Sequence, residues 1–304
     1  MLPSDFFKLI FLASIWGGSF IFLRVATPEV GPILTATMRI ILAGIVLIGF
    51  AGMTGVTMNW RRNITAFAVV GLFAAALPFS LFSYAALHLP AAYSALLNST
   101  APLFGAVFSV FYLAERLTAR KLAGLAMGVA GVAVLVGAGA LVLKVEVLLS
   151  AAACLAAAAC YAISSIIVKK TGRPQSGHTG GIHPIAMAAG SMACGGLMMA
   201  PTLPFLLPIA MPSPAALWSV AGMSVLSSGL AQAIFIPLIV RIGPTRAMTV
   251  SFLIPLFSML WGYIFLHEAV RASTLVGAAI VMVAMWLVLS ASRPEPEDAL
   301  TVEA

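Results

Sequence analysis

The sequence predicts an all-α integral membrane protein with ten transmembrane helices, arranged as two inverted five-helix repeats with both termini in the cytoplasm. Three observations support this prediction: 62% of the 304 residues are apolar and only 8% are charged, the apolar residues form long runs, and the second half of the chain repeats the first. A soluble domain carries about 25% charged residues, which excludes a water-soluble globule. About 20 residues per crossing allow ten spans with short connections and no second, soluble domain.

The distribution of special residue types favours helical spans and excludes several other classes. The 18 prolines and 26 glycines lie among continuous apolar runs, unlike the alternating pattern of barrel strands. The net charge of +7 is spread between these runs, so nucleic acid is not an expected partner. Cys154, Cys160 and Cys194 lie within apolar runs and have no metal-ligand or disulfide spacing. They are predicted to be packing residues, and we expect no metal and no cofactor.

Apolar runs between charges and Gly/Pro clusters define the predicted spans. In order they are 6–26, 32–51, 64–87, 93–113, 121–141, 146–168, 184–206, 215–240, 246–266 and 272–291. The first run is too long for a signal peptide, its flanking charges Asp5 and Lys8 are mixed, and no small-x-small cleavage site follows. We therefore expect it to remain as a helix.

The orientation follows from the Lys and Arg residues of alternate loops. The side of the N-terminus holds Lys8, Arg61, Arg62, Arg116, Arg120, Lys121, Lys169, Lys170, Arg173, Arg241, Arg246 and Arg293, and the other side holds Arg24, Lys144 and Arg271. This bias predicts a multi-pass protein of the bacterial inner membrane with both termini in the cytoplasm. Residues 293–304 are acidic and interrupted by proline, and they are predicted to be a disordered tail.

The chain contains an internal repeat. A shift of 153 residues aligns eight identical residues within 25 positions, namely Pro102, Leu103, Phe104, Leu113, Glu115, Leu122, Gly124 and Ala126 with Pro255, Leu256, Phe257, Leu266, Glu268, Leu275, Gly277 and Ala279. Earlier in the chain, a shift of 145 pairs Trp16 with Tyr161, Ser19 with Ser164 and Arg24 with Lys169. The predicted repeats are residues 1–141 and 142–292. Five helices are an odd number, so the second copy enters the membrane from the opposite side, which is typical of transporters.

The segment from Ser99 to Val132 resembles the EamA module of the drug/metabolite transporter superfamily. The matching features are a proline early in the fourth helix (Pro102), a glutamate at its end (Glu115) and a glycine-containing fifth helix. Pro255, Glu268 and Gly277 form the second copy, while Trp16 to Arg24 and Met38-Arg39 are similar to the family's first two helices. Members with ten helices export amino acids and other small metabolites, and the bacterial YddG-type aromatic amino acid exporters are the subgroup that the pattern suggests.

The resemblance implies that helices 1, 3, 4, 6, 8 and 9 surround a central cavity, with helices 5 and 10 packed at the two ends. The side chains that could bind a small aromatic zwitterion there are Trp16, Ser19, Phe20, Phe79, Ser80, Ser83, Tyr84, Asn98, Ser99, Tyr161, Ser164, Ser165, Gln232 and Ser251. Each has an alternative role, because serines in membrane helices often bond to carbonyl groups or join helices. Tyr93, near a span end, fits the interfacial belt better.

Arg39 is the one charge well within a predicted span. Such a group is a functional hypothesis by default, although it could instead hold helix 2 against carbonyl groups or a glutamate. Pro78, Pro102, Pro237 and Pro255 interrupt helical hydrogen bonding and mark either moving bends or static kinks. Glu115 and Glu268 are expected to be structural pins at repeat-related span ends, near Arg116 and Arg271.

All nine acidic residues lie in loops, in the tail or at span ends: Asp5, Glu29, Glu115, Glu146, Glu268, Glu295, Glu297, Asp298 and Glu303. Proton-coupled multidrug pumps of the small four-helix type use a carboxylate in the middle of the membrane, which this chain lacks. The sequence therefore predicts a facilitator without obligatory proton coupling.

The leading hypothesis is an alternating-access exporter of amino acids, including aromatic ones. Carriers of nucleobases, organic anions or drug-like cations are the alternative within the same superfamily. An intramembrane enzyme would need convergent Asp, His or Lys groups or a metal site, and no such constellation is present in the sequence. A scaffold or receptor would leave the inverted repeat without a purpose. Gly124, Gly128 and Gly131 favour close packing of helix 5 within the chain, and we expect a monomer rather than a dimer.

Overall fold

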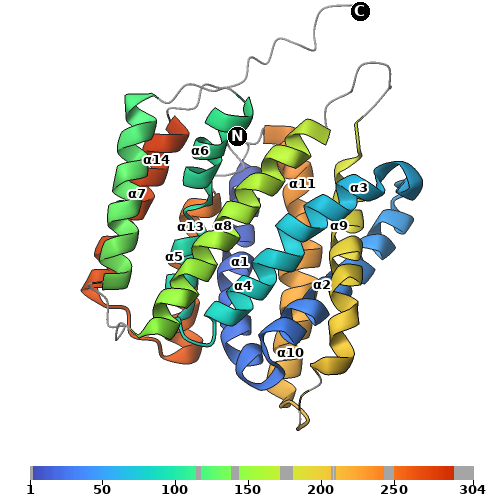
Figure 1. Ribbon diagram of the computed structural model, residues 1–304, viewed down its shortest axis with the longest axis horizontal. Coiled ribbons are helices and arrows are strands. Elements are labelled where there is room, and N and C mark those ends of the chain that lie inside the picture. Colours follow the sequence, from blue (N-terminus) through green and yellow to red (C-terminus); the bar gives the residue numbers. More distant parts are fainter. Residues whose placement is uncertain are drawn as a thin grey trace, which may run out of the picture.

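The computed structural model describes residues 3–113, 118–137, 144–171, 181–206, 208, 210–242 and 250–290. Within these residues the fold is all-α, without a β-strand. Glu115 and the predicted tail 293–304 lie outside the described residues. The helices form a single bundle, and the start of α1 and the end of α14 lie at the same end of it, at the top of Figure 1.

Helices occupy each of the predicted apolar runs. They are α1 (Pro3–Val30), α2 (Pro32–Met53), α3 (Trp60–Gly71), η1 (Leu72–Ala76), α4 (Leu77–Ala85), α5 (Ala91–Asn98), α6 (Ala101–Leu113), α7 (Ala119–Gly137), α8 (Val145–Thr171), α9 (Pro184–Met199), η2 (Ala200–Phe205), α10 (Pro214–Gly222), η3 (Met223–Leu230), α11 (Ala231–Ile242), α13 (Val250–Leu266) and α14 (Ala272–Ser290). Here η1 and η3 are π-helical and η2 is a 3₁₀ helix.

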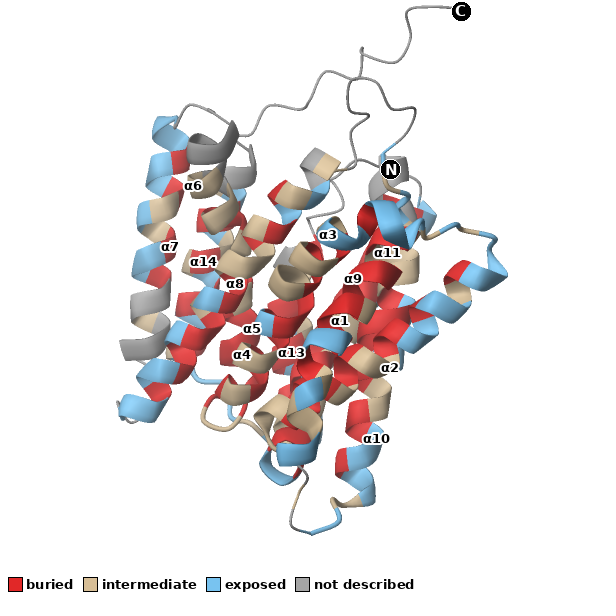
Figure 2. Cartoon of the chain, turned by 45° about the vertical axis from the view of Figure 1, so that its right-hand side comes forward, coloured by how far each residue is buried: buried red, intermediate tan, exposed pale blue. Residues whose placement is uncertain are grey.

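Six of the described helical runs are long and apolar enough to cross a membrane by length and composition. They are Pro3–Val30, Pro32–Met53, Trp60–Ala85, Val145–Val168, Pro184–Phe205 and Pro214–Phe235. The apolar helices Leu253–Leu266 and Ala272–Leu287 are shorter. Buried residues concentrate on the sides of the helices that face one another, and the outward sides of α7 and α10 are largely exposed (Figure 2). The exposed sides carry large apolar side chains, such as Leu122 and Val129 of α7 and Trp218 of α10, as is expected of helices that are apolar on all sides and span a membrane.

Four of the predicted spans are less regular than the sequence suggests: the third contains η1, the fourth is interrupted, the seventh ends in η2 and the eighth contains η3. The fourth is divided into α5 and α6, with Ser99 and Thr100 between them. Their hydroxyl groups donate to the carbonyl oxygens of Leu96 and Leu97 at 2.7 and 2.6 Å. A proline ring collides with the carbonyl group four residues before it, which accounts for a break just before Pro102. The third span contains η1, and its irregularity is described with the site below.

The helices pack in a pattern that relates the two halves of the chain. α1 packs on α13 and α10, while α8 packs on α6 and α4. α2 packs on α9, and α7 on α14. The pair α7 and α14 lies at one edge of the bundle, and α2, α3 and α9 lie at the other (Figure 1). The expectation that helices 5 and 10 occupy two different ends is therefore wrong: these helices, α7 and α14, cover the same edge together.

Small residues allow the closest of these approaches. A Cβ atom added to Gly71 of α3 would collide with the backbone of α9, including Gly195 N at 2.9 Å. A Cβ atom at Gly131 of α7 would lie 2.8 Å from Val281 Cγ2 of α14. Small residues promote helix packing in membranes because they let two backbones approach closely. The prediction that the glycines of helix 5 serve packing within the chain is met at Gly131.

The corner between α1 and α2 is built from Gly31 and Pro32. Gly31 has a φ of 85°, a left-handed conformation that glycine adopts without a steric penalty, and Pro32 opens α2, where a missing N–H is harmless. The Glu29 carboxylate beside this corner accepts hydrogen bonds from the N–H and hydroxyl groups of Ser213 at 2.6 and 2.8 Å. Since Ser213 also caps α10, this contact joins the corner to the start of a helix from the other half.

Candidate functional site

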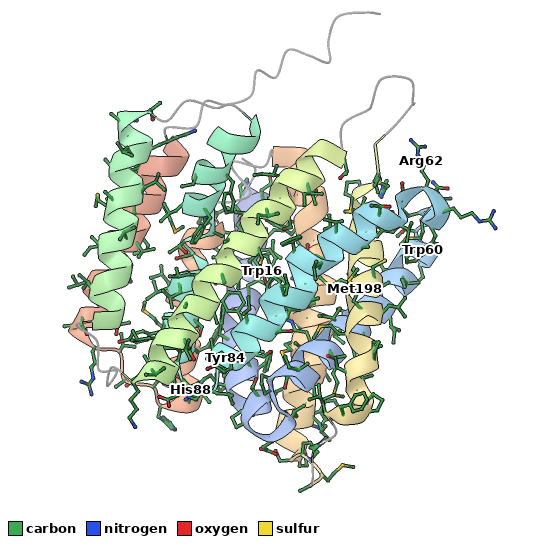
Figure 3. All side chains as sticks on the ribbon, in the orientation of Figure 1. Trp16, Trp60, Arg62, Tyr84, His88 and Met198 are labelled. Atoms are coloured by element: carbon green, nitrogen blue, oxygen red, sulfur yellow. The ribbon has the colours of Figure 1, made fainter. Side chains whose placement is uncertain are left out.

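A central cluster of polar and aromatic side chains lies where helices from both halves meet. We define it as Trp16 of α1, Arg39 of α2, Phe79 of α4, Tyr161 of α8 and Ser228 of η3. Trp16 lies about midway between the two ends of the bundle in Figure 3. The sequence predicts every member except Ser228 as a site or gating residue. Arg39 connects Phe79, Tyr161 and Ser228. Trp16 joins them through Ser227, the neighbour of Ser228 in the chain.

Trp16 connects α1 to η3. Its indole N–H donates to the carbonyl oxygen of Ser227 at 3.0 Å, and the Ser227 hydroxyl group donates in return to the carbonyl oxygen of Ile15 at 3.2 Å. The ring of Trp16 also meets Phe235 edge to face, with centroids 4.9 Å apart. The Trp16 side chain is therefore both hydrogen-bonded and fixed in orientation.

Arg39 is buried, with 6% of its surface exposed. Its Nε–H donates to Ser228 Oγ at 3.0 Å, and its guanidinium carbon lies 3.9 Å from the centroid of the Phe79 ring. Tyr161 is close enough to interact electrostatically with Arg39. A cation over an aromatic face is stabilised by the ring quadrupole, more so when it is desolvated. The cluster thus places a positive charge in an aromatic environment inside the bundle.

Local geometry recurs at the repeat-related positions of α1 and α8. The hydroxyl group of Ser19 donates to the carbonyl oxygen of Trp16 at 2.7 Å, and that of Ser164 donates to the carbonyl oxygen of Tyr161 at 2.9 Å. Trp16 packs against Phe235 of α11 and Tyr161 stacks on Phe82 of α4 with centroids 6.1 Å apart. Since Ser19 and Ser164 bond to their own helices, their hydroxyl protons are engaged within the protein.

Two π-helical segments flank the cluster. Leu77 donates its N–H to the carbonyl oxygen of Leu72, and Ala231 donates to that of Leu226, each five residues back. Pro78 is the second residue after η1, and the wider turn moves the carbonyl group of Ala74 away from the proline ring. Under the repeat shift that aligns Pro102 with Pro255, η1 falls within η3. Pro237 lies farther along the chain, within α11, rather than next to η3.

The remaining predicted residues lie around the cluster or away from it. Phe20 is buried and contacts Phe82, with centroids 5.6 Å apart. Ser80 bonds to the carbonyl oxygen of Ala76 at 2.7 Å and faces Met199 of α9. Ser83 is fully buried, and its hydroxyl group has no hydrogen-bond partner among the described residues. Gln232 is half-buried in α11, and the side chain of Ser251 in α13 lies outside the described part.

For several predicted site residues, the contacts in the described structure are with groups other than the side chains of the central cluster. Tyr84 lies near the end of α4 and meets His88 with centroids 5.7 Å apart, and both lie toward one end of the bundle in Figure 3. Asn98 is the last residue of α5, and the Ser99 hydroxyl group donates a hydrogen bond to the carbonyl oxygen of Leu96 in the same turn. Ser165 is exposed. The assignment of Tyr84 to a deep position is wrong because α4 ends at Ala85, before the end of the predicted span 64–87, which brings the end of the helix close to Tyr84.

Glu268 joins four helix ends. Its carboxylate accepts hydrogen bonds from the Ala91 N–H at 3.0 and 3.2 Å, at the start of α5, and lies 3.4 Å from Arg24 Nε. Arg24 also donates from Nη1 to the carbonyl oxygen of Ala86 at 2.7 Å, just after α4. A carboxylate at the start of a helix and a cation at its end both interact favourably with the helix dipole. Arg271 lines the same pocket as Glu268, in agreement with its expected position nearby, and the ion-pair partner of Glu268 among the described residues is Arg24.

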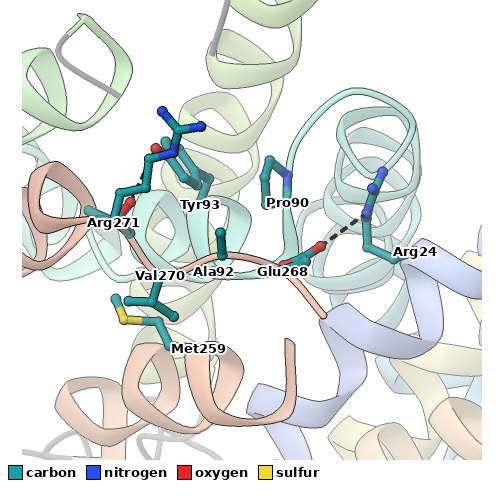
Figure 4. A pocket seen from close by; sticks show the side chains of 10 residues that line it. Arg24, Pro90, Ala92, Tyr93, Met259, Glu268, Val270 and Arg271 are labelled. Carbon is teal, nitrogen blue, oxygen red and sulfur yellow. Dashed lines mark hydrogen bonds and ion pairs between the residues drawn. The ribbon is translucent and has the colours of Figure 1, made fainter. Parts of the chain in front are cut away.

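A pocket of about 250 Å³ lies beside this ion pair (Figure 4). Its walls are formed by Arg24, Pro90, Ala92, Tyr93, Met259, Glu268, Ala269, Val270, Arg271 and Thr274. The Thr274 hydroxyl group donates to Tyr93 Oη at 3.2 Å. Among the predicted site residues, this pocket contains Glu268 but none of the central cluster, so it is a feature of the bundle end. We base the candidate site on the cluster.

The prolines occupy different settings. Pro78 and Pro102 stand at the beginnings of α4 and α6, next to the π segment and the break. Pro255 lies inside α13, which continues past it.

Sequence reasoning missed Ser227, Ser228 and the bond between Arg24 and Glu268. The Ser-Ser-Gly sequence at 227–229, polar and small inside an apolar run, is the signal that could have indicated η3.

Comparison with known proteins gives one family and consistent relatives. The profile of the EamA-like transporter family matches residues 6–137 and 148–290. The uncharacterized transporter YvbV of Bacillus subtilis is 26% identical, over 97% of this chain and 94% of its own. The "Probable terminal-alkyne amino-acid exporter" of Streptantibioticus cattleyicolor is 28% identical over 45% of this chain and 46% of its own. A solved crystal structure with 21% identity has a TM-score of 0.64 and covers 94% of this chain and 96% of that chain, and shares its fold.

Proposed function

The chain belongs to the EamA-like transporter family, and from this premise we propose that it is an alternating-access carrier that exports amino acids, including aromatic ones, across the bacterial inner membrane. Its relatives are named transporters, so the chain is a membrane transporter rather than an enzyme. The substrate, the direction of transport and the absence of proton coupling belong to the proposal.

The observation that carries the proposal is the central cluster. It combines one cation, hydroxyl groups and the aromatic rings of Trp16, Phe79 and Tyr161 at the meeting of helices from both halves of the chain. Transporters built from inverted repeats bind their substrates at the repeat interface, near discontinuous helices. The chemistry of the cluster is suited to an amino acid with an apolar or aromatic side chain. One relative that is named an amino-acid exporter adds support.

Inverted symmetry supports the alternating-access part of the proposal. The family profile matches the chain twice in succession, in keeping with repeats at 1–141 and 142–292 and with ten spans. The helix contacts and the two π segments also correspond under exchange of the halves. Two such halves can exchange conformations, which opens a fixed site first to one side of the membrane and then to the other.

The Arg24–Glu268 ion pair provides a means of closing one end. The proposed topology puts this pair at the periplasmic side, where it joins α1, α5 and α13 to the residue after α4. The repeat gives Lys169 and Glu115 the corresponding positions at the cytoplasmic side. We propose that each pair closes its own end while the other opens. Ser19, Phe20, Ser83 and Ser164 would then line or support the path between them.

The experiment that tests this function is uptake of labelled tryptophan, phenylalanine and threonine into proteoliposomes, with and without a pH gradient. Saturable uptake that reaches equilibrium and does not depend on the gradient is expected. Accumulation that requires the gradient would refute the facilitator mechanism but keep the amino-acid carrier. Absence of uptake of all three by folded protein would refute the amino-acid proposal and favour nucleobases, organic anions or drug-like cations as test substrates.

A further inference from the structure

Arg39 has hydrogen-bonding capacity that the described residues do not use. A guanidinium group has five N–H donors. Nε–H donates to Ser228 Oγ, and the four N–H groups on the Nη atoms have no hydrogen-bond acceptor within the described part of the chain. Arg39 is nevertheless buried, with only 6% of its surface exposed. A buried charge needs a partner. The N–H groups that remain, on the two Nη atoms, can form a bidentate pair with two oxygen atoms of one ligand.

The sequence offers this cation no internal counter-charge. All nine carboxylate side chains lie in loops, in the tail or at span ends, and the ion pair formed among the described residues, between Arg24 and Glu268, is at the end of the bundle. The facing helix α9, which is the counterpart of α2 in the other half, has no charged residue between Pro184 and Met199. Among the described residues, the positive charge of the cluster therefore has no paired carboxylate, and the facing helix of the other half supplies no second charge.

The surroundings of Arg39 determine which kind of anion fits. The guanidinium carbon lies over the Phe79 ring and Nε–H donates to Ser228, which leaves the N–H groups on the two Nη atoms (the Nη edge) for a ligand. Two parallel N–H donors at this edge match the two oxygens of a carboxylate. A single cation can pair with one carboxylate, whereas a doubly charged phosphate ester would leave one negative charge unpaired in an apolar region.

We propose that Arg39 binds the carboxylate of the transported molecule through its Nη edge, with Phe79 and Ser228 holding the guanidinium group in position. This inference rests on the proposed function and names the group by which its site recognises a substrate. The substrate class is then a monocarboxylate, with the aromatic side chains of Trp16 and Tyr161 available to its apolar part. Esters and amides of the same molecules are excluded as good ligands.

The test is isothermal titration of the detergent-purified full chain with phenylalanine, phenylalanine amide and 3-phenylpropionate. The wild-type protein is expected to bind both carboxylates at least about tenfold more tightly than the amide, because charge-assisted bonds exceed neutral ones. Arg39→Gln is expected to weaken carboxylate binding about 10- to 100-fold and to leave amide binding unchanged. Arg39→Lys keeps the charge without the planar fork and should give an intermediate affinity.

The matched control is Arg62→Gln, the same chemical change at an exposed arginine of α3 that points away from the bundle (Figure 3). It should bind all three compounds as the wild type does. If Arg39→Gln fails to elute as folded protein in gel filtration, Arg39→Lys carries the test. An amide that binds as tightly as phenylalanine, or full carboxylate affinity in Arg39→Gln, would overturn the inference.

The same panel separates this inference from the function on which it rests. Binding of 3-phenylpropionate that depends on Arg39, without binding or uptake of phenylalanine, would refute the amino-acid function and support the carboxylate site. Uptake of phenylalanine at equal rates and equal KM by the wild type and Arg39→Gln would support the function and refute the site. The KM measurement matters because a merely structural role for Arg39 would reduce the amount of active protein without changing KM.

Discussion

Individual side chains in this bundle have roles that depend on neighbours far away in the sequence. The sequence predicts that Arg39 is important because it is a charge inside a span, but it leaves open whether the residue is structural or functional. The structure adds the contacts with Phe79, from another helix of the same half, and with Ser228, from the other half of the chain. Hydrophobic periodicity reveals which residues face inward, but not which distant side chain each of them reaches.

The same limit explains the residue-level errors. The sequence places Glu268 near Arg271, and the two do line one pocket, but it does not reveal the ion pair of Glu268 with Arg24, which belongs to the first helix. Tyr84 resembles an inward residue because it shares a helical face with Ser80, yet it lies near the end of its helix, beside His88. Predictions that depend on depth within a span fail where the boundary moves by a few residues.

Glu268→Gln should lower the stability of the protein. The substitution removes the charge that pairs with Arg24 and weakens the bonds to the Ala91 N–H, and the Glu268 side chain is only 15% exposed. Hydrogen bonds to charged groups contribute about 1.5–3 kcal/mol each. Because the amide oxygen of glutamine can still accept one bond, we expect the free energy of unfolding to fall by about 1–2 kcal/mol.

The measurement is the midpoint of thermal unfolding in detergent. Arg271→Gln is the control, because Arg271 lines the same pocket and is exposed, and it has no ion pair with Glu268 in the described structure. This control should unfold at the wild-type temperature, while Glu268→Gln unfolds several degrees lower. Equal midpoints for the two variants would contradict the role of Glu268 as a pin.

At the scale of single elements, the sequence predicts the position of helices better than their regularity. Every predicted run contains helix, because length and apolar composition are sufficient to indicate a membrane-spanning segment. The sequence does not determine the form of the irregularities, because the same residue type, proline, adjoins a π turn at Pro78 and a break at Pro102 but lies inside an unbroken helix at Pro255. Proline alone therefore does not identify a functional interruption.

Pro78→Ala should affect transport more than Pro255→Ala. Pro78 adjoins η1, and Phe79, the next residue, holds the guanidinium group of Arg39. Restoring an N–H at position 78 allows the regular i to i−4 hydrogen bond and favours conversion of the π turn to α-helix, which would rotate Phe79 relative to Arg39. Initial uptake rates in proteoliposomes, normalised to the protein inserted, should fall at least about tenfold for Pro78→Ala, because displacement by about 1 Å can cost about 100-fold.

Pro255→Ala is the matched control for that comparison. It makes the same change inside α13, which has no π segment at this position. Its uptake rate is expected to remain within about twofold of the wild type, and both variants should elute as folded protein. Equal loss of transport in the two variants, or none in Pro78→Ala, would show that η1 is not needed to position the cluster.

At the scale of the whole molecule, the described helices account for a bundle whose two halves correspond in their contacts. The start of α1 and the end of α14 lie at the same end (Figure 1). The sequence adds the orientation, because twelve Lys and Arg residues are predicted on the side of the N-terminus and three on the other. This positive charge is expected to be retained in the cytoplasm. The structure thus shows that the first and last helices share one end of the bundle, and the charge distribution predicts which side of the membrane that end faces.

Two methionines provide a matched test of orientation. Met53, at the end of α2, and Met211, in the connection before α10, are both 89% exposed, and the predicted topology puts them on opposite sides of the membrane. In whole cells, a membrane-impermeant maleimide should label Met211→Cys directly and Met53→Cys only after permeabilisation. Cys154 and Cys194 are buried and Cys160 is partly buried, so the wild type is the background control. The reverse labelling pattern would contradict the positive-inside assignment.

Counterflow in proteoliposomes tests the central claim most directly, namely that the chain is an alternating-access facilitator for amino acids. Vesicles loaded with unlabelled phenylalanine are diluted into a trace of labelled phenylalanine at equal pH on both sides. A carrier with an exchanging site predicts a transient accumulation of label above its external concentration, which decays as the unlabelled gradient dissipates. Label that never exceeds the external concentration, together with accumulation driven by an imposed pH gradient, would contradict the claim.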